Sequence, residues 1–216
     1  MEDGRRTYDN AGRREQARRR RAAILEACRA VLERDGYAEL TIRAVAAAAG
    51  VSQETIYKVY GNKRALVKAL YDVTLAGDDE PVALGQRPEM RRLLLEPDPG
   101  RKIATYAHLA RRVSERVGAI AAQLDAELTA ETDRERLIGT TRFVGHLAEG
   151  GHLRPGLDAV QAADACWLLL SPQVYRLATS GRGWSADDYE AWLARMLTAA
   201  LLPAGSAPSG GSSPAS

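Results

Sequence analysis

The sequence has few of the residues that would point to a disulfide-linked or metal-binding protein. Its 216 residues include two cysteines, three histidines and one phenylalanine. Cys28 and Cys166 lie far apart in helical patterns, so they indicate neither a disulfide framework nor a zinc site, and we interpret both as buried thiols. The spacing of His146, His152 and Cys166 does not match a zinc-binding helix, so we expect no metal and no cofactor.

Long apolar runs are also missing. Runs such as ACWLLL (165–170) are far shorter than the ~18 to 20 apolar residues that a membrane crossing requires. The N-terminal stretch MEDGRRTYDNAGRREQARRRR has no apolar segment of the kind found in secretory signals. We therefore expect a cytoplasmic protein without a membrane partner. A hydrophobic content of 45% is still ample for a buried core in one or two domains.

The net charge is only +2, but the charged residues are unevenly distributed. Residues 1–70 contain 15 Lys+Arg and 9 Asp+Glu, whereas residues 71–216 contain 15 and 19. A basic N-terminal part is typical of a protein that meets a polyanion. A solvated arginine-rich face is the alternative interpretation of the charge alone.

The apolar pattern predicts an all-α fold of about nine or ten helices. Apolar residues recur at helical spacing, and no alternating run indicates a strand. The first helix should end at Asp35-Gly36, and its apolar face consists of Ile24, Ala27, Cys28, Val31 and Leu32. Towards the N-terminus this face continues as Arg21, Arg18 and Arg14, which predicts a basic extension beyond the core.

Capping residues and helix breakers set the other predicted boundaries. Thr41, Ser52 and Asn62 are the expected N-caps of three helices, with Gly50 between the first two, and the third of these helices should end near residue 76. Further helices are expected at 88–95, 100–114, 116–129, 131–149, 158–179 and 186–201. Pro172 lacks an N–H donor and should kink the helix that contains it.

Two short helices joined at Gly50 form a helix-turn-helix pattern. In this motif the second helix enters the major groove of DNA, and its N-terminal residues meet base edges. Gln53 is suited to adenine, Glu54 to the amino group of cytosine, and Thr55 to a base edge or a thymine methyl. Tyr57 and Lys58 follow and are suited to phosphate oxygens. The pattern therefore predicts double-stranded DNA as a partner.

Lys63 stands in the first turn of a predicted helix, where the helix dipole disfavours a cation by ~0.3 to 1 kcal/mol. A phosphate over this helix N-terminus would explain the residue, because free backbone N–H groups and the ammonium would bind it together. The alternative is an exposed lysine that costs little.

The segment LTIRAVAAAAGVSQETIYKVYGNKRALVKAL (40–70) resembles the DNA-binding segment of the tetracycline-repressor (TetR) family of bacterial regulators. The matching positions are Thr41, Ile42, Arg43, Val45, Ala46, Ala49, Gly50, Val51, Ser52, Thr55, Ile56, Tyr57, Lys63 and Leu66. The resemblance adds Thr41, Arg43 and Ser52 to the expected DNA-contacting residues.

Some residues depart from the family pattern. Val59 stands where the family often has His or Tyr, which puts one phosphate contact in doubt, and Tyr60 replaces the usual Phe. Asn62 replaces Ser and can still cap a helix. The C-terminal stretch GWSADDYEAWLARMLTAALL (183–202) and the excess of Arg over Lys resemble actinobacterial members.

The resemblance implies an N-terminal three-helix DNA-binding domain and a larger C-terminal helical domain for ligand binding and dimerisation. The corresponding boundaries are a basic flexible arm and helix start at 1–20, the helix-turn-helix domain at 21–70, the regulatory domain at 71–202 and a disordered tail at 203–216.

The last two predicted helices carry a heptad-like apolar seam. Its residues are Val160, Ala163, Trp167, Leu170, Val174 and Leu177 on one helix, and Tyr189, Trp192, Leu193, Met196 and Leu197 on the other. The resemblance implies that these helices form a four-helix bundle with their copies from a second chain. Packing within one chain would explain the same pattern.

The resemblance also implies a pocket for a small-molecule ligand that remains unknown. Candidates to line the pocket are Tyr106, Phe143, Trp167, Gln173 and Tyr175. Aromatic residues at helical spacing are also what an ordinary core contains.

The expected function is a homodimeric, nucleoid-associated transcriptional regulator, a repressor that a ligand releases from a palindromic operator. The alternative is an architectural DNA-binding protein with weak sequence specificity, whose affinity comes from the basic arm. An enzyme is not expected, because we find no nucleophile–base constellation, phosphate loop or paired metal ligands.

Overall fold

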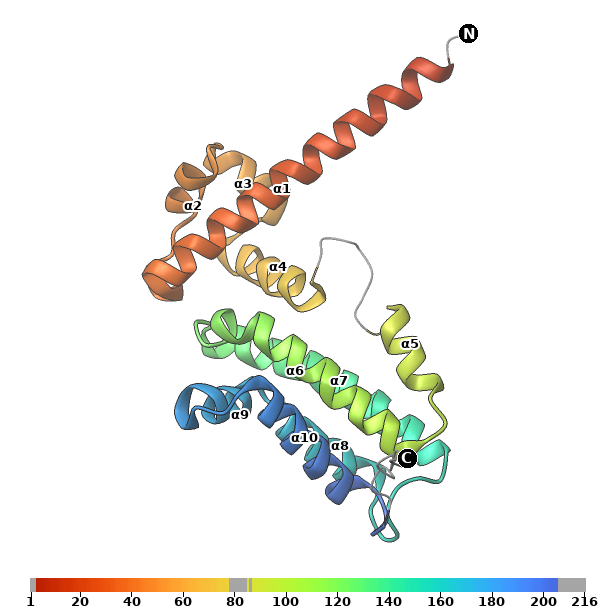
Figure 1. Cartoon of the computed structure of the whole chain (residues 1–216). Coiled ribbons are helices and arrows are strands. Elements are labelled where there is room, and N and C mark those ends of the chain that lie inside the picture. The colour runs from red at the N-terminus through yellow and green to blue at the C-terminus, as the bar shows by residue number, and fades with distance from the viewer. Residues whose placement is uncertain (1–2, 78–84, 86, 206–216) are drawn as a thin grey trace, which may run out of the picture. The chain divides into compact units, whose positions relative to one another are not determined.

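The computed structural model describes residues 3–77, 85 and 87–205 (Figure 1). The elements in these residues are helices, without a strand, which confirms the all-α prediction. The chain divides into two compact units, Met1–Glu80 with Ala119–Leu128, and Pro81–Gly118 with Thr129–Ser216. Among the described helices, none combines the length and the apolar character that a membrane crossing requires.

The first unit contains α1 (Asp3–Glu39), α2 (Ile42–Ala49), α3 (Gln53–Tyr60) and α4 (Lys63–Ala76). Helix α1 packs against α2 and α4 through its apolar face, where Ile24, Cys28 and Leu32 are fully buried. The side chains of the three predicted N-caps, Thr41, Ser52 and Asn62, each accept a hydrogen bond from a backbone N–H in the first turn, which confirms these helix starts.

Helix α1 is longer than predicted. Its backbone is helical from Asp3, so the arm predicted as flexible at 1–20 is helical in the described residues. Arginine and alanine favour helices, and Glu15 accepts a hydrogen bond from Arg19 at 3.0 Å across one turn. At Gly36 the backbone leaves the helix with φ 76° and ψ 168°, a conformation that favours glycine, so the predicted end at Asp35-Gly36 coincides with this break.

The second unit contains α5 (Pro88–Leu95), most of α6 (Pro99–Ala121) and of α7 (Ala126–Glu149), α8 (Ala159–Leu169), α9 (Pro172–Arg176) and α10 (Ala186–Leu201). Its core gathers buried side chains from all of these helices except the short α9; they include Leu93, Ile103, Phe143, Cys166, Tyr189 and Leu193. The thiols of Cys28 and Cys166 are both buried and free, as predicted, and burial raises the pKa of each to about 12.

The two predicted breaks between helices near residues 115 and 130 were wrong. The helices expected at 100–114, 116–129 and 131–149 are two helices, α6 and α7, because the chain turns at 122–125 rather than near 115 and 130. Val117 and Ile120 continue the buried face of α6, and Asp125 caps α7 by accepting a hydrogen bond from the Leu128 N–H at 2.8 Å.

The segment predicted as one kinked helix at 158–179 is interrupted completely at Pro172. Helix α8 ends at Leu169, and α9 starts at Pro172, with Ser171 as its N-cap. A π-helical turn, η2 (Leu177–Gly181), follows. Proline at the first helical position is compatible with a new helix start, so the ring separates two helices instead of bending one.

The predicted domain boundary at 70/71 falls inside α4. Tyr71 and Thr74 are buried, and the Arg29 side chain donates a hydrogen bond to the Thr74 hydroxyl at 2.7 Å. Helix α4 therefore belongs wholly to the first unit. Residues 206–216 of the predicted tail lie outside the described residues.

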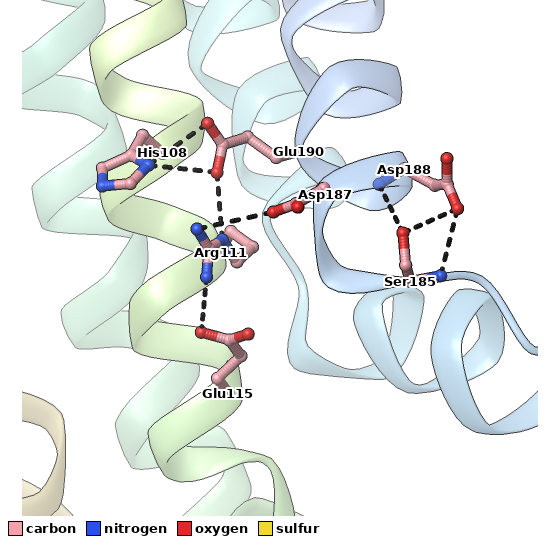
Figure 2. Close-up of polar contacts among 7 residues, drawn as sticks. All are labelled: His108, Arg111, Glu115, Ser185, Asp187, Asp188 and Glu190. Atoms are coloured by element: carbon pink, nitrogen blue, oxygen red, sulfur yellow. Dashed lines mark hydrogen bonds and ion pairs between the residues drawn. The ribbon is translucent and has the colours of Figure 1, made fainter.

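A network of charged side chains joins α6 to α10 (Figure 2). Arg111 of α6 donates to Glu190 of α10 at 3.0 Å and to Glu115 at 2.9 Å. The other oxygen contacts of Glu190 are with His108 Nδ1, at 3.1 and 3.2 Å. Asp187 lies at the edge of the network, 3.8 Å from Arg111. Glu190 is thus the acceptor that two side chains of α6 share.

We expect Glu190→Gln to lower the free energy of unfolding by about 1 to 2 kcal/mol, because hydrogen bonds to a charged, partly buried group are worth about this much. The matched control is Asp187→Asn, which alters a carboxylate that is 92% exposed against 26% for Glu190. Its effect should stay below about 1 kcal/mol. Urea unfolding followed by circular dichroism measures both, and equal losses would contradict the role given to Glu190.

Candidate nucleic-acid interface

The turn between α2 and α3 is built by local hydrogen bonds. The Thr41 hydroxyl accepts from the Ala44 N–H at 3.1 Å at the start of α2. Gly50 ends α2 in the left-handed conformation, φ 65° and ψ 32°, and its N–H bonds back to carbonyls of the last turn. The Ser52 hydroxyl then accepts from the Thr55 N–H at 3.2 Å and starts α3. These contacts hold α3 at a defined angle to α2.

Helix α3 has one buried side and one exposed polar side. Ile56 is fully buried and anchors the helix to the core of the first unit. Gln53, Glu54 and Lys58 are exposed, and the Tyr57 side chain is 51% exposed. The predicted base-contacting and phosphate-contacting residues therefore lie mostly on the free surface of α3.

Thr55 is placed differently from its neighbours on α3. The residue is half-buried, and its hydroxyl lies 2.9 Å from the Ser52 hydroxyl. Part of its hydrogen-bonding capacity is therefore used within the cap. Thr41 and Arg43 are exposed at the start of α2, and in the described part of the chain neither Arg43 nor Lys58 forms an ion pair. Both cations are available to an outside anion.

Lys63 has partners within the first unit that the sequence did not suggest. Its ammonium donates to the Ala38 carbonyl at 3.0 Å and lies 4.5 Å from the centre of the Tyr37 ring. These contacts compensate the cation at the start of α4, so no phosphate is needed to explain the residue. The phosphate contact of Lys63 stays a prediction.

The residues predicted to line a ligand pocket form several contacts in the second unit. Tyr106 and Phe143 are buried and stacked, with ring centres 3.8 Å apart. Trp167 donates to the Asp133 carbonyl at 3.0 Å, and Tyr175 lies edge-on to the buried Tyr189. Gln173 is exposed at the start of α9. The structure brings Tyr106 and Phe143 together and shows no contact of Gln173 with them.

A hollow of about 810 Å³ lies elsewhere in this unit. Its lining residues come from the start of α6, the loop before α8 and the end of α10: Gly100, Ala104, Arg154, Pro155, Ala194, Arg195, Thr198, Ala199, Leu202, Pro203, Ala204 and Gly205. No predicted pocket residue lines it. Small residues dominate the lining, whereas the predicted pocket residues are mostly aromatic.

The predicted dimer residues fall into two groups. The buried group packs within the chain and comprises Ala163, Leu170, Tyr189, Leu193 and Leu197. Trp167, Val174, Trp192 and Met196 are half-buried. Val160 and Leu177 are 72% and 66% exposed, and the sequence analysis missed Leu168, which is 59% exposed. Packing within the chain therefore accounts for the buried group, and a dimer interface formed by the exposed residues stays a prediction.

The geometry of α2 and α3 defines a helix-turn-helix protein, and comparison with known proteins gives its family. Residues 24–70 match the family model described as bacterial regulatory proteins, tetR family. The chain is 33% identical over 174 residues, 74% of its length and 78% of the other protein, to the uncharacterized HTH-type transcriptional regulator YdeS of Bacillus subtilis (strain 168). The chain belongs to the tetR family.

Solved structures share the fold at low sequence identity. The structure of SmeT, the repressor of the Stenotrophomonas maltophilia multidrug efflux pump SmeDEF, is 19% identical with a TM-score of 0.63, and covers 91% of this chain and 97% of its own. A complex of SmeT with triclosan gives a TM-score of 0.67 at 21% identity, covering 91% and 99%. NalD, the secondary repressor of the MexAB-OprM multidrug efflux pump in Pseudomonas aeruginosa, gives a TM-score of 0.59 at 18% sequence identity. The match covers 87% of this chain and 98% of the NalD chain.

Family membership decides the class of function. The chain is a DNA-binding transcriptional regulator and not an enzyme, because the tetR family to which it belongs consists of bacterial regulatory proteins. Within the residues that the structure describes, no group of three or more side chains could hold a metal ion. The comparisons do not bear on the predicted actinobacterial type.

We expect Gly50→Ala to lower the free energy of unfolding by about 1 to 2 kcal/mol, since an L-residue is strained at positive φ. The matched control is Gly139→Ala in α7, where an added Cβ also has no atom within 4 Å and φ is not positive. That change should stabilise by up to about 1 kcal/mol. Thermal and urea unfolding measure both, and equal signs would contradict the conformational argument.

Proposed function

We propose that the protein is a homodimeric repressor that binds a palindromic operator and leaves it when a small molecule occupies the C-terminal unit. The observation that carries this proposal is the geometry of α3, which is held from below by Ile56 and presents Gln53, Glu54, Tyr57 and Lys58 outward. A rigid helix with exposed polar side chains suits major-groove binding.

The division of labour on this surface follows from side-chain chemistry. Gln53 and Glu54, at the N-terminal end of α3, are placed to meet base edges, and Thr55 contributes through its methyl group while its hydroxyl stays with Ser52. Tyr57, Lys58 and Arg43 are suited to phosphates. Thr41 and Ser52 have a structural role as caps, and each can also approach the DNA backbone from an exposed position.

Exposed apolar side chains on the second unit support a dimer. Val160 and Leu168 are two turns apart on α8, and Leu177 follows in η2. A second copy would remove these side chains from water, which is worth about 25 cal/mol per Å² of apolar area. Two copies related by a two-fold axis place two α3 helices about one DNA turn (~34 to 36 Å) apart, which requires a palindromic site.

Release by a ligand needs a physical link to the DNA-binding helices, and the residues around Tyr37 offer one. Tyr37 lies beneath the Lys63 ammonium, and Asp125, in the turn between α6 and α7, is close enough to the Tyr37 hydroxyl to affect its pKa. Burial and the Asp125 carboxylate both raise the pKa of Tyr37. Arg64 at the start of α4 forms an ion pair with Glu127 of α7.

Helix α6 continues from the second unit into the residues that contact Tyr37, since Ala119–Leu128 belongs to the first unit. A ligand that shifts α6 therefore acts on Asp125, Tyr37 and the start of α4, which follows α3 directly. The efflux-pump repressors SmeT and NalD, and the SmeT complex with triclosan, support a repressor that responds to a small molecule.

Capture of sheared genomic DNA by the purified protein tests the proposed function. At about 150 mM salt, where non-specific attraction to phosphates is weakened, sequencing of the bound fragments should return a few fragments that share a palindrome. Uniform recovery across the genome would contradict sequence-specific repression.

Substitutions on α3 should separate base contacts from phosphate contacts. Gln53→Ala should change the preferred sequence and cost about 1 to 3 kcal/mol on the best site, whereas Lys58→Ala should weaken every sequence by a similar factor. Binding measured by fluorescence anisotropy on the captured palindrome and on its single-base variants gives both quantities. The same uniform loss for both variants would contradict the assigned roles.

Tyr37→Phe keeps the ring beneath Lys63 and removes the hydroxyl that lies near Asp125. We expect unchanged DNA affinity without ligand and a smaller loss of affinity with ligand. Because the three tryptophans, Trp167, Trp184 and Trp192, all lie in the second unit, quenching of their fluorescence identifies a ligand from a panel of aromatic compounds that includes triclosan. An unaltered ligand effect on DNA binding would contradict the proposed link.

A further inference from the structure

We propose that the N-terminal half of α1 carries a second DNA-binding surface, formed by Arg13, Arg14, Arg20 and Arg21, that binds the phosphate backbone beside the site read by α3. This surface lies outside the family segment, which begins at residue 24. The proposal rests on the proposed function in one respect only, that α3 faces DNA.

The four arginines continue the face of α1 that packs against the rest of the first unit. Successive residues of an α-helix are about 100° apart, so positions 20 and 21 lie one turn from Ile24 on the same side, and positions 13 and 14 lie two turns further along it. Ile24 and Cys28 are fully buried on this face, whereas Arg14, Arg20 and Arg21 are exposed. Because α2, α3 and α4 cover only the later turns, the earlier turns extend past them with this face uncovered (Figure 1).

The charges of this segment are arranged by face. Between residues 12 and 21 there are six arginines and one acid, Glu15. Glu15 lies on the opposite side of the helix and forms ion pairs with Arg18 at 3.4 Å and Arg19 at 3.0 Å. The prediction that Arg18 continues the apolar face was therefore wrong, because position 18 lies about 120° around the helix from Ile24. In the part of the chain that the structure describes, Arg14, Arg20 and Arg21 form no ion pair. Arg14, Arg20 and Arg21 on the inner face therefore keep their positive charge, while the outer arginines are partly neutralised.

The inner face is close to the recognition helix. Arg21 is near enough to Tyr60, the last residue of α3, for its positive charge to lower the pKa of that phenol, although burial has the larger and opposite effect. The surface thus starts beside α3 and runs away from it along one helix. From residue 13 to residue 21 it spans ~12 Å at 1.5 Å per residue, which equals the rise of about three to four base pairs.

These features favour DNA over other polyanions. Arginine is suited to bidentate contacts with phosphate, and the surface is continuous with a helix whose partner is DNA. A membrane surface would require an apolar face opposite the charges, but the outer face carries Glu15, Arg18 and Arg19. The DNA site contacted by the protein should therefore extend beyond the base pairs that α3 contacts.

A comparison of two charge-matched variants tests the surface. Arg20→Ala/Arg21→Ala alters the inner face, and Arg18→Ala/Arg19→Ala removes the same number of charges from the outer face. Alanine preserves the helix, and urea unfolding checks that both variants are folded. The DNA probes are the palindrome recovered by selection from a random library, with flanks of eight base pairs or none, and a mixed-sequence duplex of equal length.

On the flanked duplex, the slope of log K against log salt should fall by about 2 per protomer for the inner-face variant, since each lost phosphate contact contributes about 0.9. The outer-face variant should change this slope by less than half as much. On the duplex without flanks, the two variants should have the same affinity. Equal slopes for both variants on the flanked duplex would overturn the proposal.

The two proposals can fail separately. If selection recovers no preferred sequence, sequence-specific repression fails, and the slopes on the mixed-sequence duplex still test the arginine surface. If the palindrome is recovered and the inner-face variant equals the outer-face variant, the arginine surface fails and the repressor stands.

Discussion

The structure of the DNA-binding unit depends on the burial of one apolar stripe on α1. Ile24, Cys28 and Leu32 are fully covered, and α2 and α4 pack on them. Helix α3 has eight residues, too few to be stable alone, and its own anchor is Ile56. The core formed by α1, α2 and α4 therefore fixes the position of α3, which contributes little to that core. The exposed side chains of α3 are not needed for stability and can be used for binding.

Within the first unit, Tyr37 lies between α4 and the turn that joins α6 to α7. Its ring supports Lys63, its hydroxyl lies near Asp125, and the nearby backbone break at Gly36 precedes it in the chain. A cation at the start of α4 contradicts the preference set by the helix dipole, and the Ala38 carbonyl and the Tyr37 ring offset that cost. The unfavourable position of Lys63 is thus explained by an intramolecular contact that links α1 and α4.

Local rules predicted the first half of the chain well. Thr41, Ser52 and Asn62 are caps, and Gly50 is left-handed, because these features depend on neighbouring residues only. The turn at 122–125 was missed because no proline or glycine marks it, and the partners of Lys63 were missed because Ala38 is 25 positions away. Helical periodicity cannot distinguish packing within a chain from packing between chains, so the predicted seam mixed buried Leu193 with exposed Val160.

The two cysteines have a practical consequence. Cys28 and Cys166 are fully buried, with pKa values of about 12, so neither thiolate is significantly populated at neutral pH. A cysteine introduced on the exposed surface would then be the reactive thiol, and it could carry a spin label or a fluorophore without prior removal of the native pair. In the proposed dimer, one such label per chain would let the separation of the two DNA-binding units be followed directly in solution.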